Sequence, residues 1–188
     1  MVTPTPSVPP LACAATPEPC RTPTVPQKAT LLLKSYAQAH YKDQLVWKGL
    51  KGAATMKAEF GDPITTESYA FCIYDNNGLV KGTSVAPGGT CGLRPCWANK
   101  FFSYIFKDKT LAQGGILSVF LKEGLVDGTA KFVVKGKGAN LLLPPDLTTL
   151  QSPVTVQLKN SLGNCWGAVY SFPPATKSNS QNFKDKSD

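Results

Sequence analysis

Short segments in which apolar and polar residues alternate recur along this chain, and they constrain its fold more than any other feature. Alternation with a period of two is the pattern of a β-strand with one buried face. The segment PVTVQLKN is the clearest case, because Val154, Val156 and Leu158 fall on one face and polar residues on the other. The pattern predicts about nine strands, at residues 29–36, 43–49, 54–60, 68–74, 78–86, 115–122, 129–136, 153–160 and 165–172.

The turns between these segments indicate how the strands pair. Asn77-Gly78 readily takes the positive φ angles of a tight hairpin, so we expect residues 68–75 and 79–86 to pair antiparallel. Short strands separated by turns favour two packed sheets over a closed barrel. The sequence therefore predicts an all-β fold, an antiparallel two-sheet sandwich of the jelly-roll or immunoglobulin-like kind.

Composition divides the chain into three parts. Residues 1–27 are rich in threonine and proline, a composition that favours an extended linker or stalk. Residues 28–172 hold the expected strands and form the predicted sandwich domain. Residues 173–188 are polar, and we expect a C-terminal tail that is mobile apart from Phe183.

The six cysteines could serve a metal, redox chemistry or disulfide bonds. Cys91 and Cys96 lie within the spacing of a zinc half-site, but Cys72 and Cys165 stand alone in predicted strands. A redox pair would need Cys-x-x-Cys at the start of a helix, and the pattern predicts no such helix. Three disulfides in an oxidising compartment fit better.

The spacing alone leaves the connectivity open, because four cysteines in the core allow three arrangements. We expect two local loops, Cys13–Cys20 and Cys91–Cys96. The third bond, Cys72–Cys165, would then join two distant strands.

The formal net charge of +8 arises mainly from lysine, since Arg21 and Arg94 are the only arginines. Readers of nucleic-acid sequence favour arginine for its planar fork. We therefore expect salt-sensitive attraction to polyanions, with no specific nucleic-acid partner.

Motifs for catalysis are missing from the sequence. It contains no G-x-S-x-G, H-E-x-x-H or phosphate-binding loop, and the one histidine, His40, reads as a surface residue. No spacing singles out a pair of carboxylates. We expect no enzyme activity, no cofactor and no bound metal.

Aromatic residues are the remaining candidates for a binding surface. Trp47 and Trp166 lie in predicted strands and are expected in the core. Trp97 follows the Cys91–Cys96 loop and precedes ANKFFSYIF, which includes Tyr104. Trp97 could cover the core, or it could stack with Tyr104 on a sugar.

Several stretches together resemble a known type of module. They are DQLVWKGLKGAAT, YAFCIYDNNG, PGGTCGLRPCW, KGKGAN, PVTVQLKNS and CWGAVYS. Over residues 28–188 the chain resembles an uncharacterised cysteine-containing module of predicted secreted bacterial proteins, often placed behind Thr/Pro-rich stretches. The resemblance implies export, and it brings no functional residues with it.

These observations combine into one expectation and one alternative. We expect a secreted, extracellular or cell-surface module with a structural, adhesive or surface-assembly role, whose partners are other extracellular protein subunits or polysaccharide. The alternative is a carbohydrate-binding module that uses exposed aromatics near Trp97. No segment approaches the roughly 18 apolar residues of a membrane span, so we expect no membrane insertion.

Overall fold

The computed structural model describes residues 10–188, and within them the fold is all-β with antiparallel sheets. The strands are β1 (Ala29–Lys34), β2 (Gln44–Gly52), β3 (Tyr69–Asp75), β4 (Gly78–Val85), β5 (Thr90–Cys91), β6 (Arg94–Pro95), β7 (Trp97–Lys100), β8 (Ser103–Lys107), β9 (Ile116–Lys122), β10 (Ala130–Lys137), β11 (Val154–Asn160), β12 (Cys165–Tyr170), β13 (Lys177–Asn179) and β14 (Asn182–Lys186). Short 3₁₀ turns η1 (His40–Lys42), η2 (Lys57–Phe60), η3 (Ala139–Leu141) and η4 (Leu147–Thr149) connect them.

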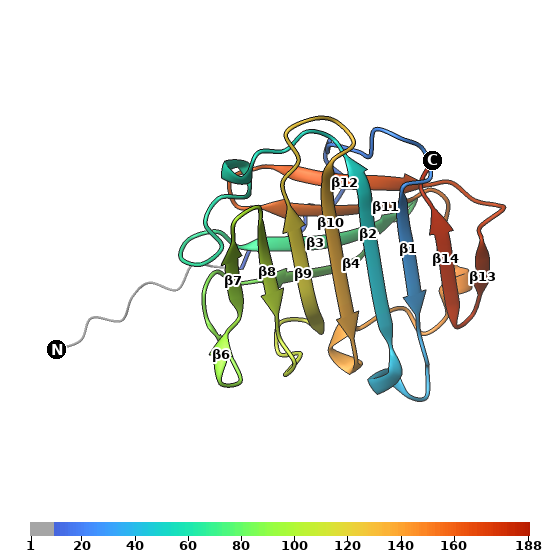
Figure 1. Cartoon of the computed structure of the whole chain (residues 1–188). Coiled ribbons are helices and arrows are strands. Elements are labelled where there is room, and N and C mark those ends of the chain that lie inside the picture. The colour runs from blue at the N-terminus through green and yellow to red at the C-terminus, as the bar shows by residue number, and fades with distance from the viewer. Residues whose placement is uncertain (1–9) are drawn as a thin grey trace.

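The larger sheet has eight strands in the order β13-β14-β1-β2-β10-β9-β8-β7 (Figure 1). Every second residue of β1 is buried, and β10 alternates between buried and more exposed residues along its whole length. Because successive side chains of a strand point to opposite faces, one face of this sheet is apolar and the other meets water.

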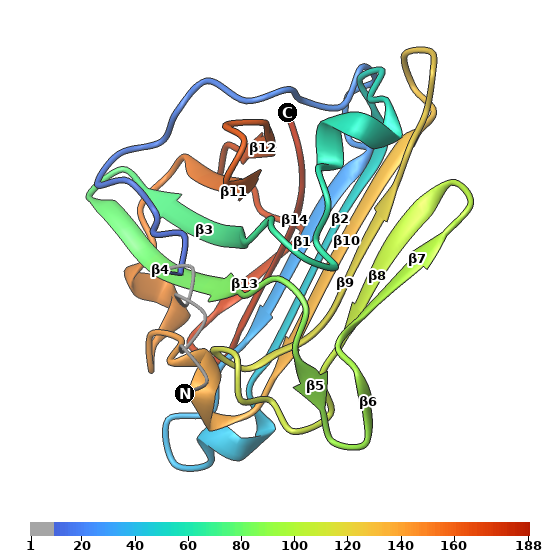
Figure 2. The same cartoon turned by 90° about the vertical axis from the view of Figure 1, so that its left-hand side faces the viewer.

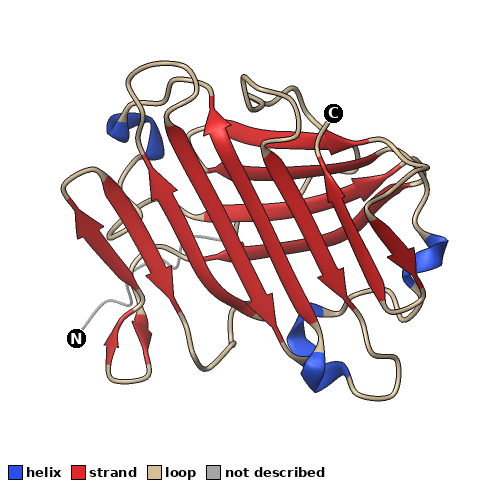
Figure 3. Ribbon diagram, turned by 45° about the vertical axis from the view of Figure 1, so that its right-hand side comes forward, coloured by secondary structure: helices blue, strands red, loops and turns tan. Residues whose placement is uncertain are grey.

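The smaller sheet has four strands in the order β12-β11-β3-β4. Figure 3 shows the two sheets as separate layers whose strands cross. The two sheets and the β5–β6 hairpin together exceed the roughly eight strands of a jelly roll and the roughly seven to nine of an immunoglobulin-like domain.

Aromatic side chains join the two layers. The Trp47 indole Nε1 on β2 donates a hydrogen bond to the Tyr170 hydroxyl on β12, 3.0 Å away. The Phe132 and Trp166 rings stack across the layers with centroids 5.1 Å apart. Trp47 and Trp166 are each 1% exposed, which confirms their predicted place in the core.

The N-terminal segment packs against the smaller sheet. All of β3 except Asp75 is buried, because Leu11 and Cys13 cover its outer face beside Ala70, Cys72 and Tyr74. Figure 2 shows this chain running around the four-stranded sheet, on the side away from the larger one. Residues 10–27 are therefore part of the folded unit, unlike the linker that composition predicts; residues 1–9 of that predicted linker lie outside the described residues.

Three disulfides anchor the chain, and two differ from the expected pairs. Cys91–Cys96 is confirmed as a local loop. Cys13 bonds to Cys72 and Cys20 bonds to Cys165, so the expected pairs Cys13–Cys20 and Cys72–Cys165 are wrong. The physical reason is that the N-terminal segment runs over the smaller sheet, which brings each of its cysteines next to a strand.

The C-terminal residues also differ from the prediction. Residues 173–188 were expected to be a tail that is mobile apart from Phe183, yet β14 pairs along its whole length with β1, from Thr30↔Lys186 to Lys34↔Asn182. Phe183 is fully buried, and its ring lies 5.1 Å from that of Phe172. The domain therefore extends beyond residue 172.

The other predicted strands agree with the structure except in two regions. The hairpin at Asn77-Gly78 is confirmed, with Asp75 opposite Gly78. Residues 54–60 do not form a strand: Lys57–Phe60 form the turn η2, because Glu59 accepts a hydrogen bond from the backbone amide of Met56 and closes the turn. The strands β7 and β8 fall outside the predicted set.

Peptide mapping of the unreduced protein tests the disulfides. We expect cross-linked peptides for Cys13–Cys72, Cys20–Cys165 and Cys91–Cys96. A matched reduced sample should lose all three. A Cys13–Cys20 peptide in the native protein would contradict the packing of the N-terminal segment.

Replacing Phe183 tests the place of β14. Phe183→Ala should lower the free energy of unfolding in urea by about 3–5 kcal/mol, because a buried aromatic is removed. The control Phe101→Ala changes a ring that is 82% exposed and should shift stability by no more than about 0.5 kcal/mol. Equal effects of the two changes would mean that the C-terminal residues are a tail.

Candidate functional site

The predicted binding residues Trp97 and Tyr104 point into the core. Trp97 is 3% exposed, and its Nε1 donates a hydrogen bond to the Ala86 carbonyl at 2.9 Å. Its ring packs between those of Tyr69 and Phe106, at centroid distances of 5.6 and 5.2 Å. Tyr104 is 8% exposed, so neither ring presents a face to a sugar. Of the two roles considered for Trp97, its burial agrees with the cover of the core and not with the stacking surface, because β7 and β8 turn Trp97 and Tyr104 inward.

Other aromatics do not replace that surface. Within residues 10–188 the exposed aromatic side chains are Tyr41, Phe101 and Phe102. Tyr41 lies on η1, whereas Phe101 and Phe102 form the turn between β7 and β8. They make no row of coplanar rings along a sheet.

The outer face of the larger sheet carries a different arrangement, an apolar stripe across four strands. Val133 on β10 lies opposite Phe120 on β9, which lies opposite Ile105 on β8, which lies opposite Ala98 on β7. All four are partly exposed. We call this row the apolar stripe.

Lysines border the apolar stripe on both sides. On one side a row contains Lys131, Lys122, Ser103 and Lys100 in cross-strand register. On the other side a row contains Lys135, Ser118 and Lys107. Residues two apart on a strand are roughly 7 Å apart, so each lysine row lies within reach of a ligand on the stripe.

Carboxylates are missing from this face. The strands of the larger sheet contain a single one, Asp185, which is 6% exposed and accepts a hydrogen bond from the backbone amide of Thr176. Lysines in the same strands are Lys34, Lys48, Lys51, Lys100, Lys107, Lys122, Lys131, Lys135, Lys137, Lys177, Lys184 and Lys186. A face of this kind attracts anions along its whole width.

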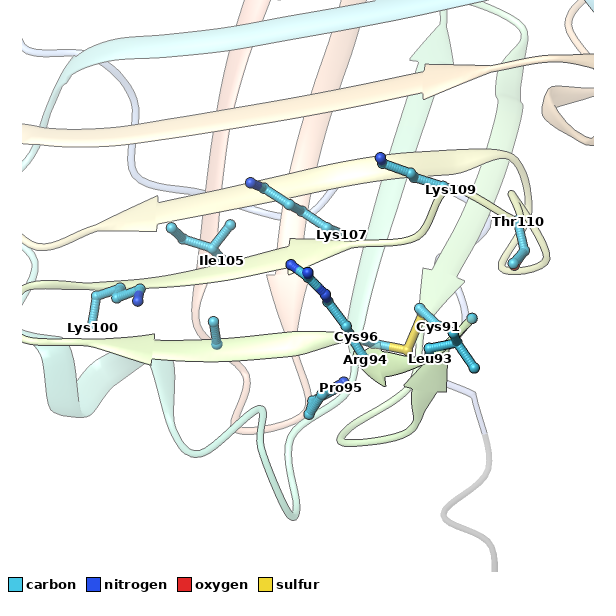
Figure 4. A pocket seen from close by; sticks show the side chains of 12 residues that line it. Cys91, Leu93, Arg94, Pro95, Cys96, Lys100, Ile105, Lys107, Lys109 and Thr110 are labelled. Atoms are coloured by element: carbon cyan, nitrogen blue, oxygen red, sulfur yellow. A yellow bond between two sulfur atoms is a disulfide. The ribbon is translucent and has the colours of Figure 1, made fainter.

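A groove of about 750 Å³ continues the stripe at the sheet edge. Its floor includes Ala98 and Ile105, and the Cys91–Cys96 loop forms one wall. Arg94, Lys107 and Lys109 also line it, and Figure 4 shows their charged ends around one opening. No acidic residue lines this groove.

The wall of the groove is a stapled hairpin. Gly92, at the turn between β5 and β6, has φ +71°, a value that side chains other than glycine rarely adopt. The Cys96 amide donates to the Gly89 carbonyl at 3.0 Å, and the Lys107 amide donates to the Cys96 carbonyl at 2.8 Å. The disulfide and these bonds hold Arg94 beside Lys107.

A buried carboxylate holds the opposite wall. Asp108 is fully buried and accepts hydrogen bonds from the Thr110 amide at 2.8 Å and the Ala112 amide at 3.0 Å. Burial raises the pKa of Asp108, but the hydrogen bonds from Thr110, Gln113 and Ala112 outweigh it, and the pKa lies below its ordinary value of 3.8. The inward turn of Asp108 leaves Lys107 and Lys109 directed outward.

Metal-ligating side chains do not gather into a site in the described part of the chain. His40 is 40% exposed at its side chain and its Nδ1 lies 2.9 Å from Asp43. Residues 10–188 contain no group of three or more His, Cys, Asp or Glu side chains placed to hold a metal ion. Each of the six cysteines is bound in a disulfide.

Comparison of the chain with protein-family models, curated proteins and solved structures finds no match. Over the described residues, the helical segments are all too short and too polar to cross a bilayer.

Changing Asp108 tests how the groove is supported. Since the folded-state pKa lies below 3.8, the carboxylate stabilises the fold at higher pH, and this stability is lost as the pH falls through the folded pKa. Asp108→Asn should therefore lower stability at pH 7 by about 1–3 kcal/mol and weaken its dependence on acid, as measured by urea unfolding between pH 7 and pH 2.

The neighbouring change Lys109→Gln is the control for this measurement, because Lys109 is exposed. It should leave both stability and acid dependence unchanged. An Asp108→Asn protein with the acid dependence of the original would contradict the role given to this carboxylate.

Proposed function

We propose that this chain is an exported, non-catalytic β-sandwich module that adheres to acidic polysaccharides through the outer face of its larger sheet. The observation that carries the proposal is the apolar stripe between two lysine rows on a face without an exposed carboxylate. The module would act at the cell surface or outside the cell, as an adhesive or assembly component.

An acidic polysaccharide fits both parts of this surface. Sugar rings have C–H faces that pack on apolar side chains, and Val133, Phe120 and Ile105 supply such a surface. Carboxylate or sulfate groups at the ring edges would then meet Lys131 and Lys122 on one side or Lys107 on the other. The exposed lysines are hydrated point charges, which suits a repeating polymer with several orientations of its anionic groups.

Nucleic acid fits this surface less well. Single-stranded nucleic acids bind through aromatic side chains on which bases stack, and Phe120 is the only aromatic residue of the stripe. Arg94 is the only arginine of the groove, so planar bidentate contacts are scarce. These features favour polysaccharide as the partner.

Export is supported by the cysteines. Three disulfides with no free thiol belong in an oxidising compartment. The resemblance to secreted bacterial modules agrees with this location.

Retention on immobilised acidic polysaccharide, with neutral dextran as the reference matrix, tests the proposal. The variant Lys107→Gln/Lys122→Gln/Lys131→Gln removes charges on both sides of the stripe. It should bind an acidic polysaccharide about tenfold more weakly, because each exposed ion pair contributes on the order of 0.5 kcal/mol. Phe120→Ser should also weaken binding, since it breaks the apolar stripe.

A matched variant separates a site from net charge alone. Lys28→Gln/Lys42→Gln/Lys159→Gln removes the same charge from positions outside the strands of the larger sheet. It should keep most of the retention. Equal losses in the two triple variants, or no retention of the original protein at about 0.15 M salt, would overturn the proposal.

A further inference from the structure

Five large apolar side chains are exposed at one end of the larger sheet. Met56 is 58% exposed, Phe101 82%, Phe102 55%, Leu125 72% and Val126 63%. They come from three segments: the chain before η2, the β7–β8 turn and the β9–β10 loop. Figure 1 shows the β7–β8 turn and the β9–β10 loop at the same end of the sheet. We call this set the loop-tip cluster.

Backbone hydrogen bonds hold the three segments together. Thr55 and Gly124 exchange hydrogen bonds between their amides and carbonyls, at 2.8 and 3.0 Å. The Glu123 amide donates to the Phe102 carbonyl at 3.0 Å, and the Lys57 ammonium donates to the Phe101 carbonyl at 3.2 Å. The three segments are therefore held in fixed positions relative to one another, and their tips form one surface.

None of these five apolar side chains is buried, and their exposure needs an explanation. Phe101 and Phe102 pack on each other edge to face, with ring centroids 4.4 Å apart, yet both remain exposed. Turns are usually built from glycine, proline, asparagine, aspartate and serine, so two phenylalanines at a hairpin turn are unusual. A grouped apolar surface of this kind marks an interaction site.

Lysines lie next to the loop-tip cluster, at the adjoining ends of β7, β9 and β10. Lys100 directly precedes Phe101, while Lys122 and Lys131 stand opposite each other at the ends of β9 and β10. The nearby carboxylates are engaged with the neighbouring segment: Glu123 accepts from the Lys57 amide at 2.9 Å, and Asp127 accepts from the Ala54 amide at 2.8 Å. Apolar tips beside a row of lysines fit an anionic interface.

We infer that this end of the sheet docks on an anionic lipid surface, with Phe101, Phe102, Leu125 and Val126 entering the headgroup region. Peripheral contact of this kind combines buried apolar area with attraction of lysines to acidic headgroups, and it needs no spanning segment. A bilayer placed across the strand ends leaves most of the apolar stripe on the sheet face free. The two sites share the row of Lys100, Lys122 and Lys131 but use different apolar side chains, so this inference does not depend on the polysaccharide proposal.

Sedimentation with lipid vesicles tests the inference. The original protein should bind vesicles of phosphatidylcholine and phosphatidylglycerol at a ratio of about 3:1, and bind pure phosphatidylcholine far less. Phe101→Ser/Phe102→Ser should lower partitioning onto the mixed vesicles by about tenfold or more, because apolar side chains no longer leave water. Retention on acidic polysaccharide should stay unchanged in this variant.

The control variant uses exposed apolar residues at the opposite end. Tyr41 is 66% exposed on η1, and Leu142 is 74% exposed just after η3, which packs against η1. Tyr41→Ser/Leu142→Ser should keep full vesicle binding. Both double variants change exposed side chains, and urea unfolding should confirm that each is folded.

Three results would overturn the inference. The first is no sedimentation with the mixed vesicles. The second is equal vesicle binding by the Phe101→Ser/Phe102→Ser variant, which would leave only the attraction of a basic chain to acidic lipid. The third is concentration-dependent self-association that the same variant abolishes while vesicle binding persists, which would assign the loop-tip cluster to a protein interface.

Discussion

Packing of the two sheets through alternate side chains is the constraint on which the rest of this structure depends. Trp47, Phe132 and Trp166 fill the space between the layers, and each inward residue fixes the direction of its neighbours in the strand. The lysines of β8, β9 and β10 are therefore held outward by the same alternation that builds the core. Cross-strand register then aligns them into rows, so the charged face and the apolar interior are two results of one pattern.

The fold could be predicted where burial is regular within a single strand. The segments at β2, β3 and β11 contain enough apolar residues to be recognised as strands without knowledge of the neighbouring strands. The pair β7 and β8 was not recognised, because Phe101 and Phe102 occupy the turn in place of the residues that usually indicate one. The strand β14 contains one apolar residue, Phe183, and becomes a strand only because β1 is beside it.

The candidate site was less accessible to sequence reasoning than the fold. Composition indicated a basic chain, but the rows of lysines depend on the register between β8, β9 and β10, which composition does not fix. Trp97 was a candidate because it is a large aromatic residue beside a cysteine loop. Its side chain points from β7 into the core, so it is not available to bind a ligand. The same reasoning explains the disulfides, since Cys13 and Cys20 meet their partners only when the N-terminal segment crosses the smaller sheet.

The pairing of β14 with β1 would determine when the larger sheet can be completed if the chain is exported. Residues 30–34 form their second ladder with residues 182–186, so the two partners lie at opposite ends of the described chain. Contacts between such distant residues form slowly. A chain threaded through a channel from its amino-terminal end would deliver β1 first, with one edge unpaired until its partner emerges. Open strand edges pair readily with other chains, so during such a passage β1 would be exposed to aggregation until β14 emerges.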